Sequence, residues 1–590
     1  MGHPDSSGLV QVRVLQEIHD EGTKLILFFL LSNYSFYKLE CRLIGCIPMS
    51  IQVIFLDVHS FTSTTKEIVM QRENLLKKLN SDPKKLWDIA VIGGGATGLG
   101  VAVDAASRGF STVLFEQSDF AKGTSSRSTK LVHGGVRYLA QGDISLVLEA
   151  LKERGLLRQN APHLVKNQAF IIPSYDWWEG PFYNIGMKVY DMMAGKLGLG
   201  PSEKISKEET LKAIPNLDED HLNGGVIYYD GQFDDSRLAV NLAQTAIENS
   251  AIVLNYMKVI SLNKKDNMVT GVKVIDQETN EKYTIHAKVV VNATGVFVDD
   301  IIKMDDPKAN KMVRPSQGVH IILDSSFLQS DSAIMIPKTS DGRVLFAVPW
   351  HGKVVVGTTD TPLDETSLEP RALEEEIEFI LTTAAQYLKK DPTRKDVLSV
   401  FAGLRPLAAP QEGDKSTKEI SRNHKLIVSL SGLITITGGK WTTYRKMAED
   451  TIDKAILVGG LDDKSCVTEN MPIHGYVKNT DFKAPAYFYG ADRAHILDII
   501  FENSELGEKL HKDCAVTKAE VVWAVNNEMA RTVEDFLARR VRMLLLDARK
   551  SIEMAPEVAL LMAKELDYDA NWVKEQIEEY TELAKGYILE

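Results

Sequence analysis

Residues 88–116 constrain the fold of this 590-residue chain more than any other part of the sequence. An apolar stretch runs into Gly93, Gly95 and Gly98, which have the spacing G-x-G-x-x-G, and a helical pattern and a second apolar stretch follow. In a strand-turn-helix-strand unit the first glycine permits a tight turn, the second lets backbone N–H groups approach a pyrophosphate, and the third lets helix and strand pack closely. Glu116 ends the second strand, where an acidic side chain can accept hydrogen bonds from an adenosine ribose. The unit predicts a dinucleotide-binding domain.

Composition places the chain among ordinary globular proteins. Lys and Arg number 68 against 81 Asp and Glu, so the formal net charge is -13, and 44% of the residues are hydrophobic. Bulk nucleic-acid binding would require a basic surface, and we therefore exclude nucleic acid as a partner. The four cysteines are too few and too scattered for a disulfide framework or a metal site, which indicates a reducing compartment.

The first 69 residues differ in character from the rest. Their apolar runs, 25–31 and 51–56, are too short to span a bilayer, and acidic residues precede the first run, unlike the basic start of a signal peptide. The stretch 70–79 then has the apolar periodicity of an amphipathic helix. We expect the functional chain to start near Met70.

The sequence after Glu116 separates the two common dinucleotide cofactors. A nicotinamide domain would continue with further strand-helix units, whereas here a loop of small and hydroxyl residues, 123–139, is suited to wrapping a longer molecule. Later apolar strands at 287–292 and 433–437 both end in glycine turns, and the second precedes a helix whose N-terminus can face a carbonyl or phosphate. This order favours a flavin.

Seven segments together resemble the FAD-dependent glycerol-3-phosphate dehydrogenases, respiratory flavoenzymes that feed electrons to quinone. The segments are 88–116, 124–139, 289–295, 314–320, 357–360, 403–406 and 437–445. The most specific is 125–139. The resemblance implies an α/β fold in which an FAD-binding Rossmann-like domain is interwoven with an antiparallel β substrate domain over 70–445. A linker and a helical C-terminal domain would follow over 446–590, and residues 1–69 would be an unmatched extension.

The remaining sequence is compatible with that architecture. Short β-rich runs at 319–323, 343–349 and 353–359 are separated by turns. Residues 520–540 are helical in period and contain no glycine or proline, which fits a helical C-terminal part.

A polyol phosphate needs cations for its dianion and a base for the hydroxyl proton. The resemblance assigns His320 and Arg405 as catalytic residues, and Arg137, Tyr138, Arg422 and Lys440 as substrate-binding residues. Guanidinium groups match phosphate bidentately, and imidazole can accept a proton near neutral pH. A surface ion pair is an equal interpretation of Arg422. The alternative for His320 is a structural role as a core histidine in the apolar run 319–323. Only the resemblance favours a catalytic role over this alternative.

The residues expected to bind FAD lie in the glycine turn, the hydroxyl-rich loop and the two later strand ends. They are Gly93, Gly95, Gly98, Glu116, Ser125, Ser126, Lys130, His133, Gly134, Gly135, Ala293, Gly295, Gly439, Lys440 and Thr442. We predict noncovalent binding, because neither spacing nor chemistry argues for a flavin bond in the loop, where His133 is the only candidate.

Two further segments have alternative interpretations. Residues 567–578 have the ligand spacing of a calcium loop, but Trp572 stands where that loop requires glycine, so we predict a helix cap at Asp569 or Asn571 and no metal. Residues 176–193 are dense in Trp, Tyr, Phe and Met. A core helix and a membrane-interface or quinone-facing patch explain them equally well.

The sequence therefore predicts oxidation of sn-glycerol 3-phosphate to dihydroxyacetone phosphate, with hydride transfer to flavin N5 and electrons passed to a membrane quinone. One alternative is an oxidase that releases hydrogen peroxide, and another is a binding module with structural FAD. We expect a cytoplasmic protein, peripheral on the cytoplasmic face of the inner membrane. A homodimer stays open.

Overall fold

The computed structural model describes residues 12–19, 22–31, 35–42, 70–136, 143–176, 179–337, 339, 342–408 and 424–590. The chain divides into two compact units, Met1–Ile68 and Val69–Glu590. In the first unit, an antiparallel sheet forms from β1 (Val12–His19), β2 (Gly22–Leu31) and β3 (Ser35–Arg42).

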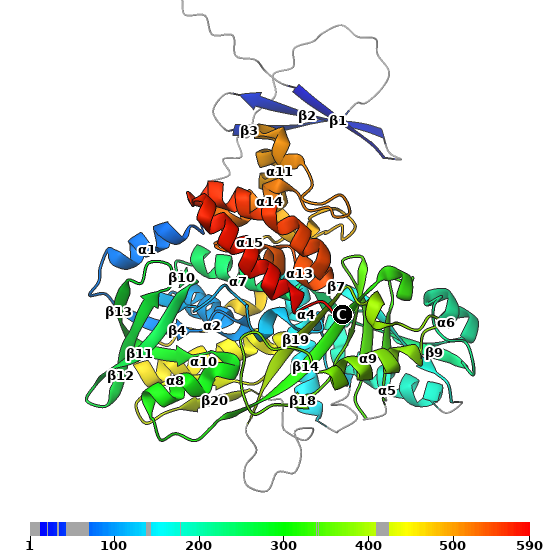
Figure 1. Ribbon diagram of the computed structural model, residues 1–590, viewed down its shortest axis with the longest axis horizontal. Helices are drawn as coiled ribbons and strands as arrows, with labels where there is room; N and C mark the ends of the chain where they lie inside the picture. Colours follow the sequence, from blue (N-terminus) through cyan, green and yellow to red (C-terminus); the bar gives the residue numbers. More distant parts are fainter. Residues whose placement is uncertain are drawn as a thin grey trace, which may run out of the picture. The chain divides into compact units, whose positions relative to one another are not determined.

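The second unit contains two sheets that share the chain (Figure 1). The first has the order β10-β5-β4-β13-β12-β11, with β21 beside β13 and β20 beside β21. Its strands are β4 (Leu86–Ile92), β5 (Thr112–Phe115), β10 (Ile252–Leu254), β11 (Met257–Lys265), β12 (Met268–Asp276), β13 (Lys282–Asn292), β20 (Lys425–Val428) and β21 (Ile434–Thr437). Four strand pairs are parallel, as a Rossmann-like domain requires: β4 with β5, β5 with β10, β4 with β13, and β13 with β21.

The second sheet is mostly antiparallel, with β18-β14-β17-β16-β15-β7-β9-β6 in order, β19 beside β14 and β8 beside β9. Its strands are β6 (Leu131–Val132), β7 (Val165–Ser174), β8 (Glu203–Ile205), β9 (Gly224–Phe233), β14 (Val313–Asp324), β15 (Ala333–Ile336), β16 (Leu345–Trp350), β17 (Lys353–Gly357), β18 (Thr361–Pro362) and β19 (Ser399–Ala408). The chain enters each sheet more than once, so the predicted interweaving of the two domains is confirmed.

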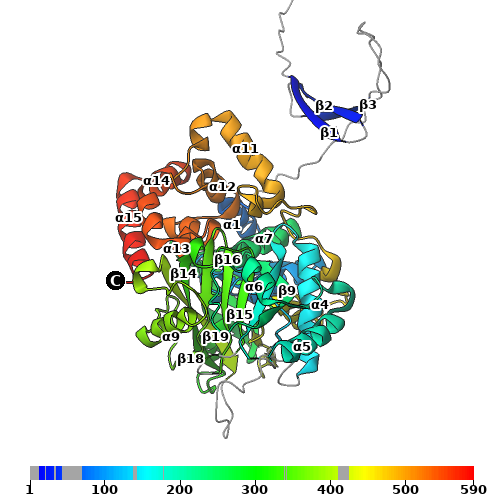
Figure 2. The same cartoon turned by 90° about the vertical axis from the view of Figure 1, so that its right-hand side faces the viewer.

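Helices cover the sheets and form the C-terminal part. They are α1 (Arg72–Asn80), α2 (Ala96–Ser107), α4 (Ile144–Asn160), α5 (Glu179–Ala194), α6 (Lys207–Ala213), α7 (Asp235–Glu248), α8 (Val298–Asp305), α9 (Glu374–Ala385), α10 (Tyr444–Gly459), α11 (Arg493–Glu502), α12 (Lys518–Glu528), α13 (Met543–Leu546), α14 (Ala548–Leu566) and α15 (Ala570–Lys585). The helix α2 packs against α7 and α10, and its residues belong to the largest apolar core. Helices α11–α15 gather at one end of this unit, which confirms the helical C-terminal domain (Figure 2).

The segment 520–540, which is helical in period, does not form one continuous helix. The helix α12 ends at Glu528, the following Met529 has a left-handed φ of 52°, and a π-helical turn, Asp535–Arg540, follows separately. Glu528 at the end of α12 pairs with Arg237 at 2.7 Å, and both side chains are buried. We attribute the break to such tertiary ion pairs, because leaving one buried partner unpaired costs more than interrupting a helix.

The helix cap predicted near the C-terminus is confirmed. Asp569 precedes α15, and its side chain accepts hydrogen bonds from the backbone N–H groups of Asn571 and Trp572. Among the described residues, no helix is long and apolar enough to cross a membrane.

Deleting residues 1–69 should leave the FAD content and the activity of the protein unchanged. The described residues that line the two cavities presented below all lie beyond residue 90, and the second compact unit starts at Val69. The flavin absorbance per protein and the rate of flavin reduction check this expectation. Loss of soluble flavoprotein on truncation would contradict it.

Candidate active site

Two cavities adjoin where the two sheets meet. The glycine-turn cavity, of about 460 Å³, lies at the carboxyl ends of β4, β5 and β13. The inner cavity, of about 300 Å³, lies against β14, β16 and β19. Both are lined by Thr124, Arg127, Pro406, Gly438, Gly439, Lys440 and Trp441. A long ligand can therefore pass from one cavity into the other.

The glycine turn allows an unusually close backbone approach. Gly93 has a φ of +107°, and a β-carbon there would lie 2.7 Å from the carbonyl oxygen of Ala293. A β-carbon on Gly98 would lie 1.9 Å from the carbonyl oxygen of Gly93. The helix α2 can therefore start directly beneath the turn, with its N-terminal end toward the cavity.

Polar groups suited to a dinucleotide face the glycine-turn cavity. The carboxylate of Glu116 accepts hydrogen bonds from the N–H groups of Gly94 at 2.6 Å and Ser118 at 2.9 Å, and burial raises the pKa of this group. Carboxylate lone pairs that remain can accept ribose hydroxyls. The hydroxyl of Ser125 accepts from the N–H of Ala96 at 2.9 Å, in the first turn of α2, where an anion is favoured.

Four of the residues expected to bind FAD lie behind these walls. Gly98 lies beneath the glycine turn, the hydroxyl of Ser126 donates to the carbonyl of Ala121, and Gly134 donates its N–H to the Tyr190 hydroxyl. Lys130 is completely buried and pairs with Asp235 at 2.8 Å. These contacts indicate that Ser126, Lys130 and Gly134 support the hydroxyl-rich loop from behind the cavity walls. The other predicted cofactor residues line one cavity or both.

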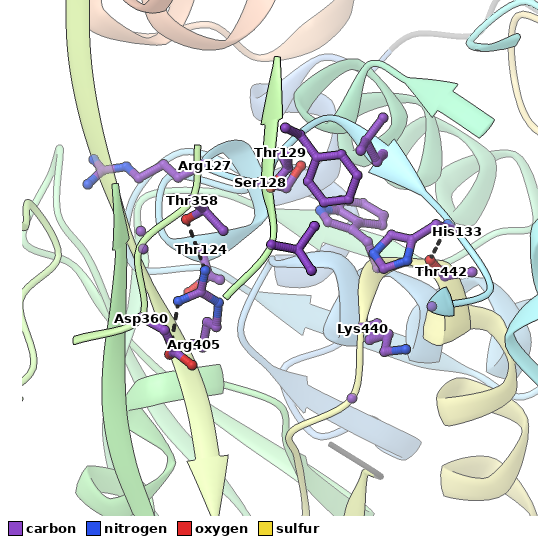
Figure 3. Close-up of a pocket in the computed structure, with 18 of the residues that line it drawn as sticks. Thr124, Arg127, Ser128, Thr129, His133, Thr358, Asp360, Arg405, Lys440 and Thr442 are labelled. Atoms are coloured by element: carbon purple, nitrogen blue, oxygen red, sulfur yellow. Dashed lines mark hydrogen bonds and ion pairs between the residues drawn. The ribbon is translucent and has the colours of Figure 1, made fainter. Parts of the chain in front are cut away.

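The inner cavity has cationic groups at two sides (Figure 3). At one side Arg405 donates to the hydroxyl of Thr358 at 3.0 Å and to the carboxylate of Asp360 at 3.3 Å. At the other side lie Lys440 and His133, whose backbone N–H donates to the Thr442 hydroxyl at 3.2 Å. Arg405 and Lys440 lie on different sides of this cavity in Figure 3, an arrangement that suits a small anionic substrate.

His320 lines the inner cavity from β14 but is only 2% exposed. Its ring stacks on Phe401, and Nε2 lies 2.9 Å from the hydroxyl of Thr129. Burial, together with the charges of Arg405 and Lys130, lowers the pKa of His320 well below its usual value. The imidazole is therefore neutral near pH 7 and can accept a proton.

Arg137, Tyr138 and Arg422 lie outside the described residues. Sequence reasoning missed several residues that line the cavities, among them Lys122, Arg127, Thr129, Arg343, Asp360 and Trp441. Arg127 and Asp360 stand within motifs that the resemblance rests on, which could have signalled them.

Comparison with known proteins places the chain in a family. The family described as FAD dependent oxidoreductase matches residues 88–445, and the C-terminal domain of alpha-glycerophosphate oxidase matches residues 433–573. The mitochondrial glycerol-3-phosphate dehydrogenase of Schizosaccharomyces pombe is 40% identical over 577 residues, which cover 86% of this chain and 89% of that protein. The chain belongs to the family of FAD-dependent glycerol-3-phosphate dehydrogenases.

Other members of this dehydrogenase family are similar to the chain over most of its length. The mitochondrial glycerol-3-phosphate dehydrogenase of Homo sapiens is 40% identical over 83% of this chain and 72% of its own length. Among solved structures, the FAD complex of glycerol-3-phosphate dehydrogenase from Bacillus halodurans has a TM-score of 0.72 at 31% identity, covering 88% of this chain and 97% of that one. As a member of the family, the chain is an FAD-dependent oxidoreductase.

FAD should leave the protein on acid precipitation. His133 is the one histidine in the loop 125–139, and neither its spacing nor its surroundings argue for a covalent flavin bond. Centrifugation after acid treatment should leave the yellow colour in the supernatant. Yellow colour in the pellet would contradict noncovalent binding.

Proposed function

We propose that this enzyme oxidises sn-glycerol 3-phosphate to dihydroxyacetone phosphate. The observation that carries the proposal is the inner cavity, in which Arg405 and Lys440 lie at two sides and a neutral His320 lines the wall, next to the glycine-turn cavity. Identity of about 40% to named glycerol-3-phosphate dehydrogenases supports the substrate.

The residues around the glycine-turn cavity fit FAD. Gly93 and Gly95 would accommodate the pyrophosphate at the start of α2, Glu116 would accept the ribose hydroxyls, and Ala293 and Gly295 would contact the middle of the cofactor. The remaining predicted FAD ligands in the inner cavity would surround the ring system. When bound, FAD supplies the hydride acceptor for the alcohol carbon.

The side chains of the inner cavity would hold the substrate and remove its proton. The guanidinium of Arg405 can bind phosphate bidentately while Asp360 keeps it oriented, and Lys440 adds a point charge. Arg137, Tyr138 and Arg422, which lie outside the described residues, stay predicted substrate-binding residues. His320 would accept the proton of the substrate hydroxyl while the carbon that bears this hydroxyl gives up its hydride.

Anaerobic flavin bleaching tests the proposal. Addition of sn-glycerol 3-phosphate should bleach the flavin absorbance, whereas glycerol, which has no phosphate for the cationic groups, should bleach it far more weakly. No bleaching by any polyol phosphate would overturn the proposal and would favour the alternative of a structural FAD.

We propose a membrane quinone as the electron acceptor. Reoxidation by a short-chain quinone should be faster than reoxidation by oxygen, and turnover in air should release little hydrogen peroxide. Stoichiometric hydrogen peroxide together with slow quinone reduction would favour the oxidase alternative.

The helix α5 is the membrane contact that we propose. Phe182, Ile185, Val189 and Met192 recur at helical spacing and are all exposed, which forms an apolar stripe on one face. On the opposite face the Tyr190 hydroxyl donates to Asp230, which lines the inner cavity, at 2.9 Å. The same helix thus joins an apolar outer surface to the wall of the active site, as a quinone route requires. The proposal for α5 therefore combines the two interpretations of residues 176–193, a core helix on one face and a membrane-interface patch on the other.

Replacing Ile185 and Met192 by serine should abolish binding to phospholipid vesicles. These side chains are 66% and 76% exposed, so their removal should not disturb the core. Leu457→Ser on α10, at a position 75% exposed, is the matched control and should leave cosedimentation with vesicles unchanged. Equal vesicle binding by the double variant would contradict the assignment.

The compartment is a further proposal. We propose that the enzyme is peripheral on the cytoplasmic face of an inner membrane. The relatives are named mitochondrial, and fractionation of the source cell distinguishes a mitochondrial location from this cytoplasmic one. Homodimer formation stays a prediction for sedimentation analysis.

A further inference from the structure

The loop at residues 117–123 is held by the C-terminal helical domain. Asp119 is completely buried, and its carboxylate accepts hydrogen bonds from Arg539 Nε at 2.5 Å and from Arg540 Nη1 and Nη2 at 2.7 and 2.9 Å. Both arginines belong to the π-helical turn after α12, and both are buried. Charge-assisted bonds of this kind are strong, so they tie the loop to the turn.

A second ion pair joins the same two segments. Lys122 Nζ lies 2.7 Å from a carboxylate oxygen of Glu534, and the other oxygen accepts from Arg539 at 2.8 Å. Although burial opposes ionisation, Arg539 and Lys122 lower the pKa of Glu534 to about 2, so the carboxylate is charged at neutral pH. The ion pair between Lys122 and Glu534 is therefore present at neutral pH.

The loop that these pairs hold is a wall of the glycine-turn cavity. Gln117, Ala121, Lys122 and Gly123 line the cavity, and the N–H of Ala121 donates to the carbonyl of Gly94 in the glycine turn at 3.0 Å. Ala121 has a φ of 59°, a left-handed conformation that alanine rarely adopts without outside support. The C-terminal contacts supply such support.

We propose that Glu534, Arg539 and Arg540 are positioning residues for FAD: they hold the loop 117–123 in the shape that the cofactor requires. The inference rests on the assignment of the glycine-turn cavity to FAD. None of the three residues is among the described residues that line the cavity, so they act through Asp119 and Lys122. Because coupling between two binding events is reciprocal, FAD should in turn stabilise the C-terminal segment.

Glu534→Gln tests the coupling against a closely matched control. Glu534 is 17% exposed and Glu278 is 21% exposed, and each pairs with one arginine of the C-terminal domain and one cation of the FAD domain. Glu278 lines neither cavity. Titration of each apoprotein with FAD, followed by flavin fluorescence, should show about tenfold weaker binding for Glu534→Gln. The Glu278→Gln variant should stay within about twofold of the parent.

Glu534→Asp serves as a rescue variant, since it restores the charge and should recover part of the affinity. A purely structural role would lower the thermal stability of both glutamine variants alike and leave their FAD affinities equal. Parent-like FAD affinity in Glu534→Gln would overturn the proposal.

Hydrogen exchange on the parent protein tests the reciprocal effect without any mutation. FAD should slow exchange of the amides at residues 529–541, while α15 in the same domain should respond much less. Unchanged exchange at 529–541 would overturn the proposal even if the variants do not fold. These measurements involve no substrate, so a protein that meets them but does not oxidise sn-glycerol 3-phosphate would overturn only the proposed function.

Discussion

Gly98→Ala should abolish FAD binding at micromolar concentrations of the cofactor. The added β-carbon would lie 1.9 Å from the carbonyl oxygen of Gly93, and a backbone atom cannot move aside as a side chain can. Overpacking of this severity costs about 3 kcal/mol or more, which corresponds to about 10² in affinity if the turn opens to relieve it. Absorbance of the purified protein and titration of the apoprotein with FAD measure the loss.

Gly186→Ala is the matched control for that substitution. Gly186 lies in α5 and lines neither cavity, and no heavy atom lies within 4 Å of an added β-carbon. This variant should bind FAD with nearly the parent affinity. Parent-like FAD binding in Gly98→Ala would show that α2 can shift, and that the close packing under the turn is not required.

His320→Ala should slow flavin reduction by about 10²–10⁴ and change the substrate affinity little, because loss of a general base affects the reacting state more than binding. Anaerobic stopped-flow measurement of flavin bleaching separates the two quantities. In the parent, the lowered pKa of His320 keeps the ring neutral in mild acid. The reduction rate should therefore persist below pH 6.5, where an exposed imidazole would be protonated.

Arg422→Ala provides a contrast, because loss of a charged bond to phosphate should raise KM and leave kcat nearly unchanged. His320→Gln guards against a packing effect, since it keeps a polar side chain in the buried site. Reduction at the parent rate in both His320 variants would assign the base elsewhere. His133 is the other histidine among the described residues that line the inner cavity.

The sequence alone predicted the fold class, and most of the residues that it assigned to the cofactor line the two cavities, for a physical reason. A glycine turn, the helix below it and the acid at the end of the next strand act through neighbours in the chain, so the residues of 88–116 carry the information themselves. The loop 125–139 likewise placed Ser125 and His133 at the cavities, although it did not show that Lys130 pairs with Asp235 instead.

Only the tertiary structure decided which distant residues meet. Asp119 and Arg539 are 420 positions apart, and Thr129 reaches His320 across 191 positions, so no local pattern signals either contact. The same holds for the break after α12, where Glu528 pairs with Arg237 from another helix. An unpaired buried charge costs more free energy than an interrupted helix. The pairing of Glu528 with Arg237 therefore outweighs the helical preference of the residues that follow α12.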